Sequence, residues 1–171
     1  TKKTTAEFRL HHPRRCECVL THDAPWEGSG CTYHNYFYDS DLGVYRMYYL
    51  GMNYTHEAPI KSIVVCYAES LDGLNWKKPN LGICEWAGSK NNNIILGSEV
   101  DCIGNFMVFK DTNPNCLPNE KYKAICSFDP VRGIDTLWSF VSPDGLHFER
   151  KEIITTEGKF PHAENALLPI V

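Results

Sequence analysis

The sequence has no long hydrophobic run, no excess of basic residues and no helical pattern. Its apolar stretches, such as residues 63–66 (Ile-Val-Val-Cys), are far too short to cross a bilayer, so we expect no membrane partner. The net charge is −4, and lysine and arginine are scattered rather than gathered in a stripe, which argues against nucleic acid as a partner. No segment repeats its apolar residues with the period of an amphipathic helix.

Cysteine pairs spaced for a metal or redox centre are also missing. None of the eight cysteines forms a Cys-x-x-Cys pair. Residues 16–18 (Cys-Glu-Cys) and the nearby His22 could supply ligands, but no second half with metal-ligand spacing follows them. The sequence therefore predicts neither a metal site nor a cofactor.

Cysteine placement also bears on the cellular compartment. Cys66 and Cys126 lie in apolar strand patterns, where a reduced thiol packs as a small hydrophobic group. The eight cysteines lack the spacing of a disulfide framework and no signal peptide is visible, which together favour a cytoplasmic location. The chain does not begin with methionine, so a removed signal peptide leaves the location open.

What the sequence does contain is a turn that occurs twice. Residues 70–76 and 142–148 share the pattern Ser-x-Asp-Gly-Leu-x-aromatic, and they lie 72 residues apart. Asp-Gly between apolar runs is typical of a hairpin turn, because glycine tolerates positive φ and the aspartate accepts hydrogen bonds from the backbone that follows. Residues 36–39 and 108–111 keep the same interval, so the sequence predicts repeated all-β units.

Strand-like segments surround these turns in two groups of four. The first group is residues 32–39, 44–50, 63–69 and 76–78, and the second is residues 105–110, 121–128, 134–141 and 148–154. A further short strand is expected at residues 8–10, and residues 79–98 read as a polar connection. Four antiparallel strands in sequence have the size of a propeller blade.

We therefore expect one incomplete β-propeller domain over residues 1–171. It would hold a first blade at about 30–80, a second at about 103–155 and the start of a third at about 164–171. Because a propeller needs at least about four blades to close, the chain is expected to be part of a longer one, or else to complete its sheets by self-association.

Several motifs carry a resemblance to a known group of enzymes. They are Ser-x-Asp-Gly-x-x-Trp followed by Lys-Pro at residues 70–79, Gly-Ser-Lys-Asn-Asn-Asn-Ile-Ile at 88–95, Phe-Lys-Asp-Thr-Asn-Pro at 109–114 and Lys-Tyr-Lys-Ala at 121–124. With them, residues 20–171 resemble the N-terminal blades of five-bladed β-propeller glycoside hydrolases of families 32, 68 and 43, and family 130 phosphorylases share the architecture. The resemblance implies a fructosidase-, arabinosidase- or xylosidase-like enzyme acting on an oligo- or polysaccharide.

Ligands of a propeller bind where the innermost strands begin, at one end of the channel. The residues to consider therefore precede each first strand: His22, Asp23, Trp26 and Glu27, then Glu99 and Asp101, then His162, Glu164 and Asn165. Each entrance carries a carboxylate. Glycosyl transfer requires two, because one protonates the leaving oxygen while another acts as nucleophile or activates water.

The resemblance also implies roles for the second and third entrances. Glu164 matches the general acid, with His162 and Asn165 placed to orient it. Asp101 matches the carboxylate that positions the substrate, with Glu99 as the alternative.

The first entrance departs from the resembled families. Fructan enzymes carry a Trp-x-Asn-Asp-Pro motif and arabinan enzymes an Asp-Pro motif, whereas residues 22–27 read His-Asp-Ala-Pro-Trp-Glu. Asp23 and Glu27 are thus both candidates for the base or nucleophile.

Two other interpretations remain beside the hydrolase. In a non-catalytic carbohydrate-binding propeller, Trp26 and Tyr33 would stack on sugars, although Trp26 could equally be a core residue between blades. A phosphorylase would need a cationic phosphate pocket, for which Arg132 and Lys159 are the candidates.

Overall fold

A computed structural model of the chain describes residues 8–53, 62–97, 105–127 and 136–157. Within these ranges the regular structure is β-strand, apart from one turn of 3-10 helix, η1 (Pro118–Glu120), so the predicted all-β class is confirmed. The same ranges contain no helix with the length and hydrophobicity needed to span a bilayer.

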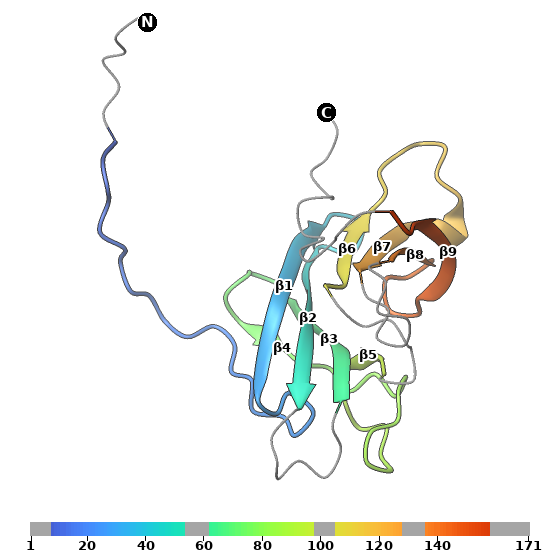
Figure 1. Ribbon diagram of the computed structural model, residues 1–171. Helices are drawn as coiled ribbons and strands as arrows, with labels where there is room; N and C mark the ends of the chain where they lie inside the picture. The colour runs from blue at the N-terminus through green and yellow to red at the C-terminus, as the bar shows by residue number, and fades with distance from the viewer. Residues whose placement is uncertain (1–7, 54–61, 98–104, 128–135, 158–171) are drawn as a thin grey trace, which may run out of the picture.

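The first sheet is formed by the first half of the chain. Its strands β1 (Gly30–Asp39), β2 (Val44–Asn53), β3 (Ser62–Ser70) and β4 (Trp76–Lys77) pair antiparallel in the order β1-β2-β3-β4 (Figure 1). A short strand, β5 (Ile94–Leu96), also pairs antiparallel with β3, beside its residues 65–66, while β4 pairs beside residues 69–70.

The second sheet repeats this order. Its strands are β6 (Met107–Lys110), β7 (Tyr122–Ser127), β8 (Leu137–Ser142) and β9 (Glu149–Thr155), paired antiparallel in the order β6-β7-β8-β9. The two predicted groups of four strands are thus confirmed, with ends that shift by a few residues.

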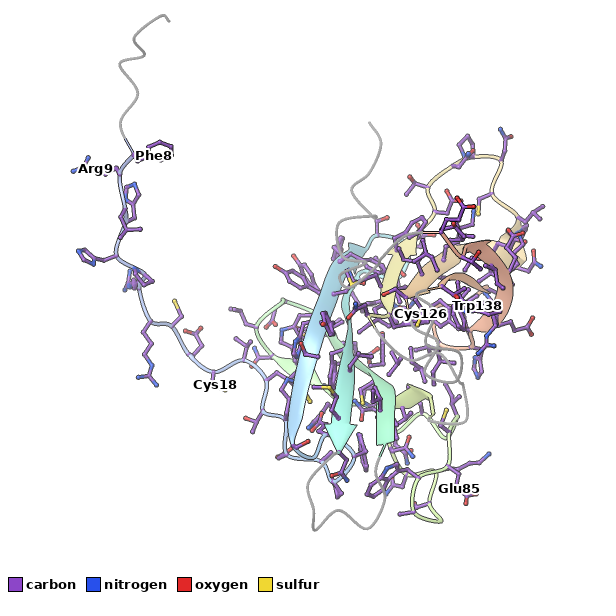
Figure 2. All side chains as sticks on the ribbon, viewed as in Figure 1. Phe8, Arg9, Cys18, Glu85, Cys126 and Trp138 are labelled. Carbon is purple, nitrogen blue, oxygen red and sulfur yellow. The ribbon has the colours of Figure 1, made fainter. Side chains whose placement is uncertain are left out.

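Two local predictions were wrong. Residues 8–10 form no strand: they lie in an extended arm that leads away from both sheets, and the side chains of Phe8 and Leu10 are exposed, so no neighbouring strand pairs with them (Figure 2). Residues 79–98 are not wholly a connection, because β5 lies within them and its three residues are buried.

Both Asp-Gly turns have the predicted hydrogen bonds. In the first, Ser70 Oγ accepts from Gly73 N at 2.9 Å, and Asp72 Oδ1 accepts from Leu74 N at 2.9 Å and Asn75 N at 2.7 Å. Donation from the Asn75 backbone holds the pKa of Asp72 well below its usual range. The second turn repeats these bonds with Ser142, Asp144, Gly145, Leu146 and His147.

An apolar core lies between the two sheets. Tyr48, Val65 and Tyr67 of the first sheet share one buried cluster with side chains from and beside the second sheet: Phe106, Val108, Tyr122, Cys126 and Phe140. Cys66, on the other face of β3, belongs to a second buried cluster. The two cysteines expected in strand interiors, Cys66 and Cys126, are both fully buried.

Polar side chains also join the sheets. Asp39, at the end of β1, is fully buried and accepts from Lys110 Nζ and from Tyr122 OH, both at 2.5 Å. Arg46 Nη1 donates to the Asp144 carbonyl oxygen at 2.7 Å, so β2 also contacts the second Asp-Gly turn.

The first strands of the two sheets are neighbours. Asn35 Oδ1 accepts from Val108 N at 3.0 Å, and four residues further along β1 the Asp39 carboxylate meets Lys110. Later residues of β1 therefore contact later residues of β6, which means that the two strands run in the same direction (Figure 1).

Candidate functional site

A buried carboxylate lies just before β1. The side chain of Glu27 is only 1% exposed. Its Oε1 accepts from Tyr49 OH at 2.7 Å and lies 3.3 Å from His22 Nδ1, while its Oε2 accepts from Ala24 N at 2.8 Å and Lys78 Nζ at 2.9 Å. Each carboxylate oxygen therefore has two polar neighbours.

These donors determine the charge of Glu27. Burial alone would raise the pKa of this carboxyl group, but donation from Tyr49, the Ala24 backbone, Lys78 and His22 outweighs it, and the pKa lies below its usual value. Glu27 is accordingly ionised at neutral pH. Burial raises the pKa of Tyr49, so its hydroxyl remains a donor.

The backbone places Glu27 against the sheet. Residues 24–27 form a turn in which Glu27 N donates to the Ala24 carbonyl oxygen at 2.9 Å, and the Glu27 side chain bonds back to Ala24 N. Gly51 of β2 lies directly below, where a Cβ atom would come within 3.0 Å of the Trp26 carbonyl oxygen. A larger residue at this position would push the turn away from β2 by a few tenths of an ångström.

A β-bulge brings two more side chains to the same place. Thr32 pairs with Leu50 but Asn35 pairs with Tyr48, so Tyr33 and His34 together oppose Tyr49. Tyr33 takes up the extra residue with a φ of 54°. In a regular strand, residues three apart face opposite sides.

The bulge places Cys31 and His34 on the face of the first sheet that carries Tyr49 of β2. The His34 ring stacks on the Tyr49 ring with centroids 5.3 Å apart, and Cys31 packs against the same cluster as Tyr49. His34 Nε2 lies 2.9 Å from His22 Nε2, so one of these nitrogens donates to the other. Burial, followed by Glu27, raises the pKa of Cys31 to about 12.

Asp23 differs sharply from Glu27 in exposure. Its side chain is 72% exposed, although both carboxylates bind the same ammonium group: Lys78 Nζ donates to Asp23 Oδ1 at 2.7 Å. That hydrogen bond holds the pKa of Asp23 below its usual value. We name His22, Asp23, Glu27, His34, Tyr49 and Lys78 the Glu27 cluster.

Trp26 is linked to this cluster from the side. Its Nε1 donates to Asn93 Oδ1 at 2.8 Å, and Asn93 Nδ2 donates to Tyr49 OH at 2.9 Å. The Trp26 ring also packs edge-on against Trp86, with centroids 5.9 Å apart, and against the core of the first sheet. Trp26 thus has both a packing role and a connection, through Asn93 and Tyr49, to Glu27.

The predicted site residues fall into three groups. His22, Asp23, Trp26 and Glu27 lie together at the entrance of β1. Tyr33 lies apart, because it packs against the core between the two sheets. The remaining candidates, Glu99, Asp101, His162, Glu164 and Asn165, and also Arg132 and Lys159, lie outside the described residues.

Sequence reasoning missed His34, Tyr49, Lys78 and Asn93. Lys78 and Asn93 do stand in the motifs that carry the family resemblance, at the Lys-Pro after the first turn and in the Asn-rich run, which is a signal that could have drawn attention to them. His34 and Tyr49 show no such signal, since their placement depends on the bulge in β1.

Possible metal ligands also gather here. Within the ranges described, His22, Glu27 and Cys31 form the one group of at least three such residues, with one ligand atom of each within 4.8 Å of the others. Cys16, Glu17 and Cys18, the other candidates, do not belong to it.

No protein-family model matches the chain, and no curated protein is significantly similar to it in sequence.

Proposed function

We propose that the two sheets are blades of a β-propeller of the five-bladed type, and that the protein cleaves a terminal glycosidic bond of an oligo- or polysaccharide. The repeated strand order supports the fold, because the first strands of the two sheets, β1 and β6, contact each other. The parallel course of β1 and β6 is the arrangement of inner strands around a propeller channel.

One observation carries the chemical proposal: two ionised carboxylates, Asp23 and Glu27, share Lys78 at the entrance of β1. A carboxyl group whose pKa lies below its usual value suits a nucleophile or a base rather than a general acid. This agrees with the role that the family resemblance gives to the first entrance. Glu164 as general acid and Asp101 as the positioning carboxylate complete the proposal.

Exposure favours Asp23 over Glu27 as the reacting group. A base or nucleophile must touch the sugar or the attacking water. Asp23 is 72% exposed, whereas Glu27 is 1% exposed and both of its oxygens already accept hydrogen bonds. We assign Glu27 the role of a positioning residue that fixes Lys78, and through it Asp23.

The hydrogen bonds to both oxygens of Glu27 also support a second candidate, a carbohydrate-binding propeller without catalysis. Fixed, fully hydrogen-bonded groups with an aromatic ring beside them are what a sugar-binding surface needs. In this alternative, His22 and Asp23 would bind sugar hydroxyls.

The hydrolase proposal predicts a large loss of activity on replacing Asp23. We would screen aryl β-fructofuranoside, α-arabinofuranoside, β-xyloside and β-mannoside with the longest native chain that contains these residues. Asp23→Asn should lower kcat/KM on the cleaved substrate by about 100- to 10,000-fold, the contribution of a positioned base. Glu164→Gln should lower kcat/KM by a similar factor.

Asp41→Asn is the matched control, since Asp41 is also an exposed aspartate paired with lysines, Lys110 and Lys121, but lies beyond the other end of β1. It should keep full activity. Unchanged hydrolysis by Asp23→Asn would refute the assignment of the base. If no substrate is cleaved but sugars still raise the melting temperature, the binding alternative replaces the hydrolase.

A further inference from the structure

The side chains of His22, Glu27 and Cys31 converge at the start of β1. They present a nitrogen, an oxygen and a sulfur within 4.8 Å of one another, and His22 Nδ1 lies 3.3 Å from Glu27 Oε1. Glu27 is buried, Cys31 is partly buried and His22 lies at the surface, so the group is open to solvent on one side.

We propose that His22 Nδ1, Glu27 Oε1 and Cys31 Sγ bind a Zn²⁺ ion, with a water molecule as the fourth ligand. Zinc accepts nitrogen, oxygen and thiolate ligands together, at about 2.0–2.3 Å in a tetrahedron. Ligand atoms around such an ion lie about 3.3–3.6 Å apart. The nitrogen and oxygen, 3.3 Å apart, are already at this separation, and the sulfur lies within 4.8 Å of both.

The surroundings of the three ligands suit a metal site. A histidine ligand usually donates its second ring N–H to a neighbouring acceptor, which fixes the ring. His22 has such a neighbour, because its Nε2 lies 2.9 Å from His34 Nε2. When Nδ1 binds zinc, Nε2 carries the proton and donates it to His34. Tyr49 OH and the Ala24 N–H hold the Glu27 carboxylate in place.

Charge favours the ion as well. Without a metal, Asp23 and Glu27 are negative, Lys78 is positive and the thiol is neutral, which leaves one net negative charge. Zinc binding displaces the thiol proton to solvent and forms the thiolate. The two carboxylates, the thiolate and Lys78 then carry a net charge of −2. The zinc ion cancels this charge, so the occupied site is neutral. The bulge at Tyr33 makes the metal site possible, because it places Cys31 and His34 on one face of the first sheet.

The test uses Co²⁺, a spectroscopic substitute for zinc, added to the whole chain. We expect one equivalent to bind with a thiolate-to-cobalt charge-transfer band and the visible bands of a tetrahedral site, and Zn²⁺ to remove both. Cys31→Ser should abolish the charge-transfer band. His34→Phe should weaken binding by about 10- to 100-fold, as expected for loss of a group that orients a ligand.

The part of the chain that the structure describes contains three other accessible thiols, which the control variant removes. Cys18, labelled in Figure 2, lies on the N-terminal arm, Cys16 precedes it by two residues and Cys116 precedes η1. The triple Ser variant at these positions should bind cobalt as the wild type does. His22→Asn, a surface substitution that leaves the core intact, should lose tight binding even if Cys31→Ser fails to fold. A charge-transfer band that is absent, survives in His22→Asn or disappears in the triple variant would overturn the proposal. The absorbance reports binding whether or not the protein hydrolyses sugars.

Discussion

Glu27→Ala is expected to lower the free energy of unfolding by about 3–5 kcal/mol, the usual result of removing one partner from a buried ion pair. The substitution would leave Tyr49 OH without its acceptor and Lys78 without one of its two carboxylates. Urea unfolding followed by circular dichroism measures the loss. Glu27→Gln should cost less, because the amide keeps the shape and one accepting oxygen.

Asp23→Ala provides the matched control for this prediction. Asp23 and Glu27 bind the same ammonium group and differ mainly in burial. An exposed ion pair contributes little to stability, so Asp23→Ala should leave the urea midpoint nearly unchanged. Equal losses for the two variants would contradict the view that Glu27 holds the cluster together and that Asp23 is free to react.

Asp39→Ala is expected to cost a similar amount, about 3–5 kcal/mol, for a different reason. Asp39 is fully buried where the sheets meet, and its removal would leave Lys110 and Tyr122 of the second sheet without their shared acceptor. Arg46 of the first sheet would lose its ion-pair partner. The same urea measurement applies. Because Asp39 joins the sheets, we also expect the transition to broaden as the two sheets unfold less cooperatively.

Asp111→Ala is the control for the sheet contact. Asp111 occupies the equivalent position 72 residues later, but its ion pair with Lys123 lies within the second sheet. Asp111→Ala should therefore lower the free energy of unfolding by less than Asp39→Ala does, and the unfolding transition should stay sharp. If Asp111→Ala is as destabilising as Asp39→Ala, Asp39 does not stabilise the protein by joining the sheets.

The sequence predicted best what depends on neighbours along the chain. The Asp-Gly turns were correct because Asp72 and Asp144 bond to backbone only two or three residues ahead. The four-strand groups followed from those turns. β5 was missed because three buried residues behind a run of asparagines look like a loop until β3 is in place beside them.

The site was predictable in its position but not in its contacts. The entrance of β1 could be located, yet whether Asp23 or Glu27 reaches solvent depends on Tyr49 and Lys78, which lie 22 and 51 residues from Glu27. The bulge that turns His34 toward His22 likewise depends on the pairing between β1 and β2, and no residue of β1 predicts it.

The proposed function requires that a carbohydrate bind beside the Glu27 cluster. Its most direct test is an NMR titration of the ¹⁵N-labelled chain with fructo-, arabino- or xylo-oligosaccharides, observing the tryptophan indole N–H signals and assigning them with Trp26→Phe and Trp138→Phe. We expect one sugar to shift the signal of Trp26, which is hydrogen-bonded to Asn93, and to leave that of Trp138, which packs under Arg150 on the second sheet. A shift of Trp138 alone, or no shift of Trp26 with any of the three sugars, would contradict the claim.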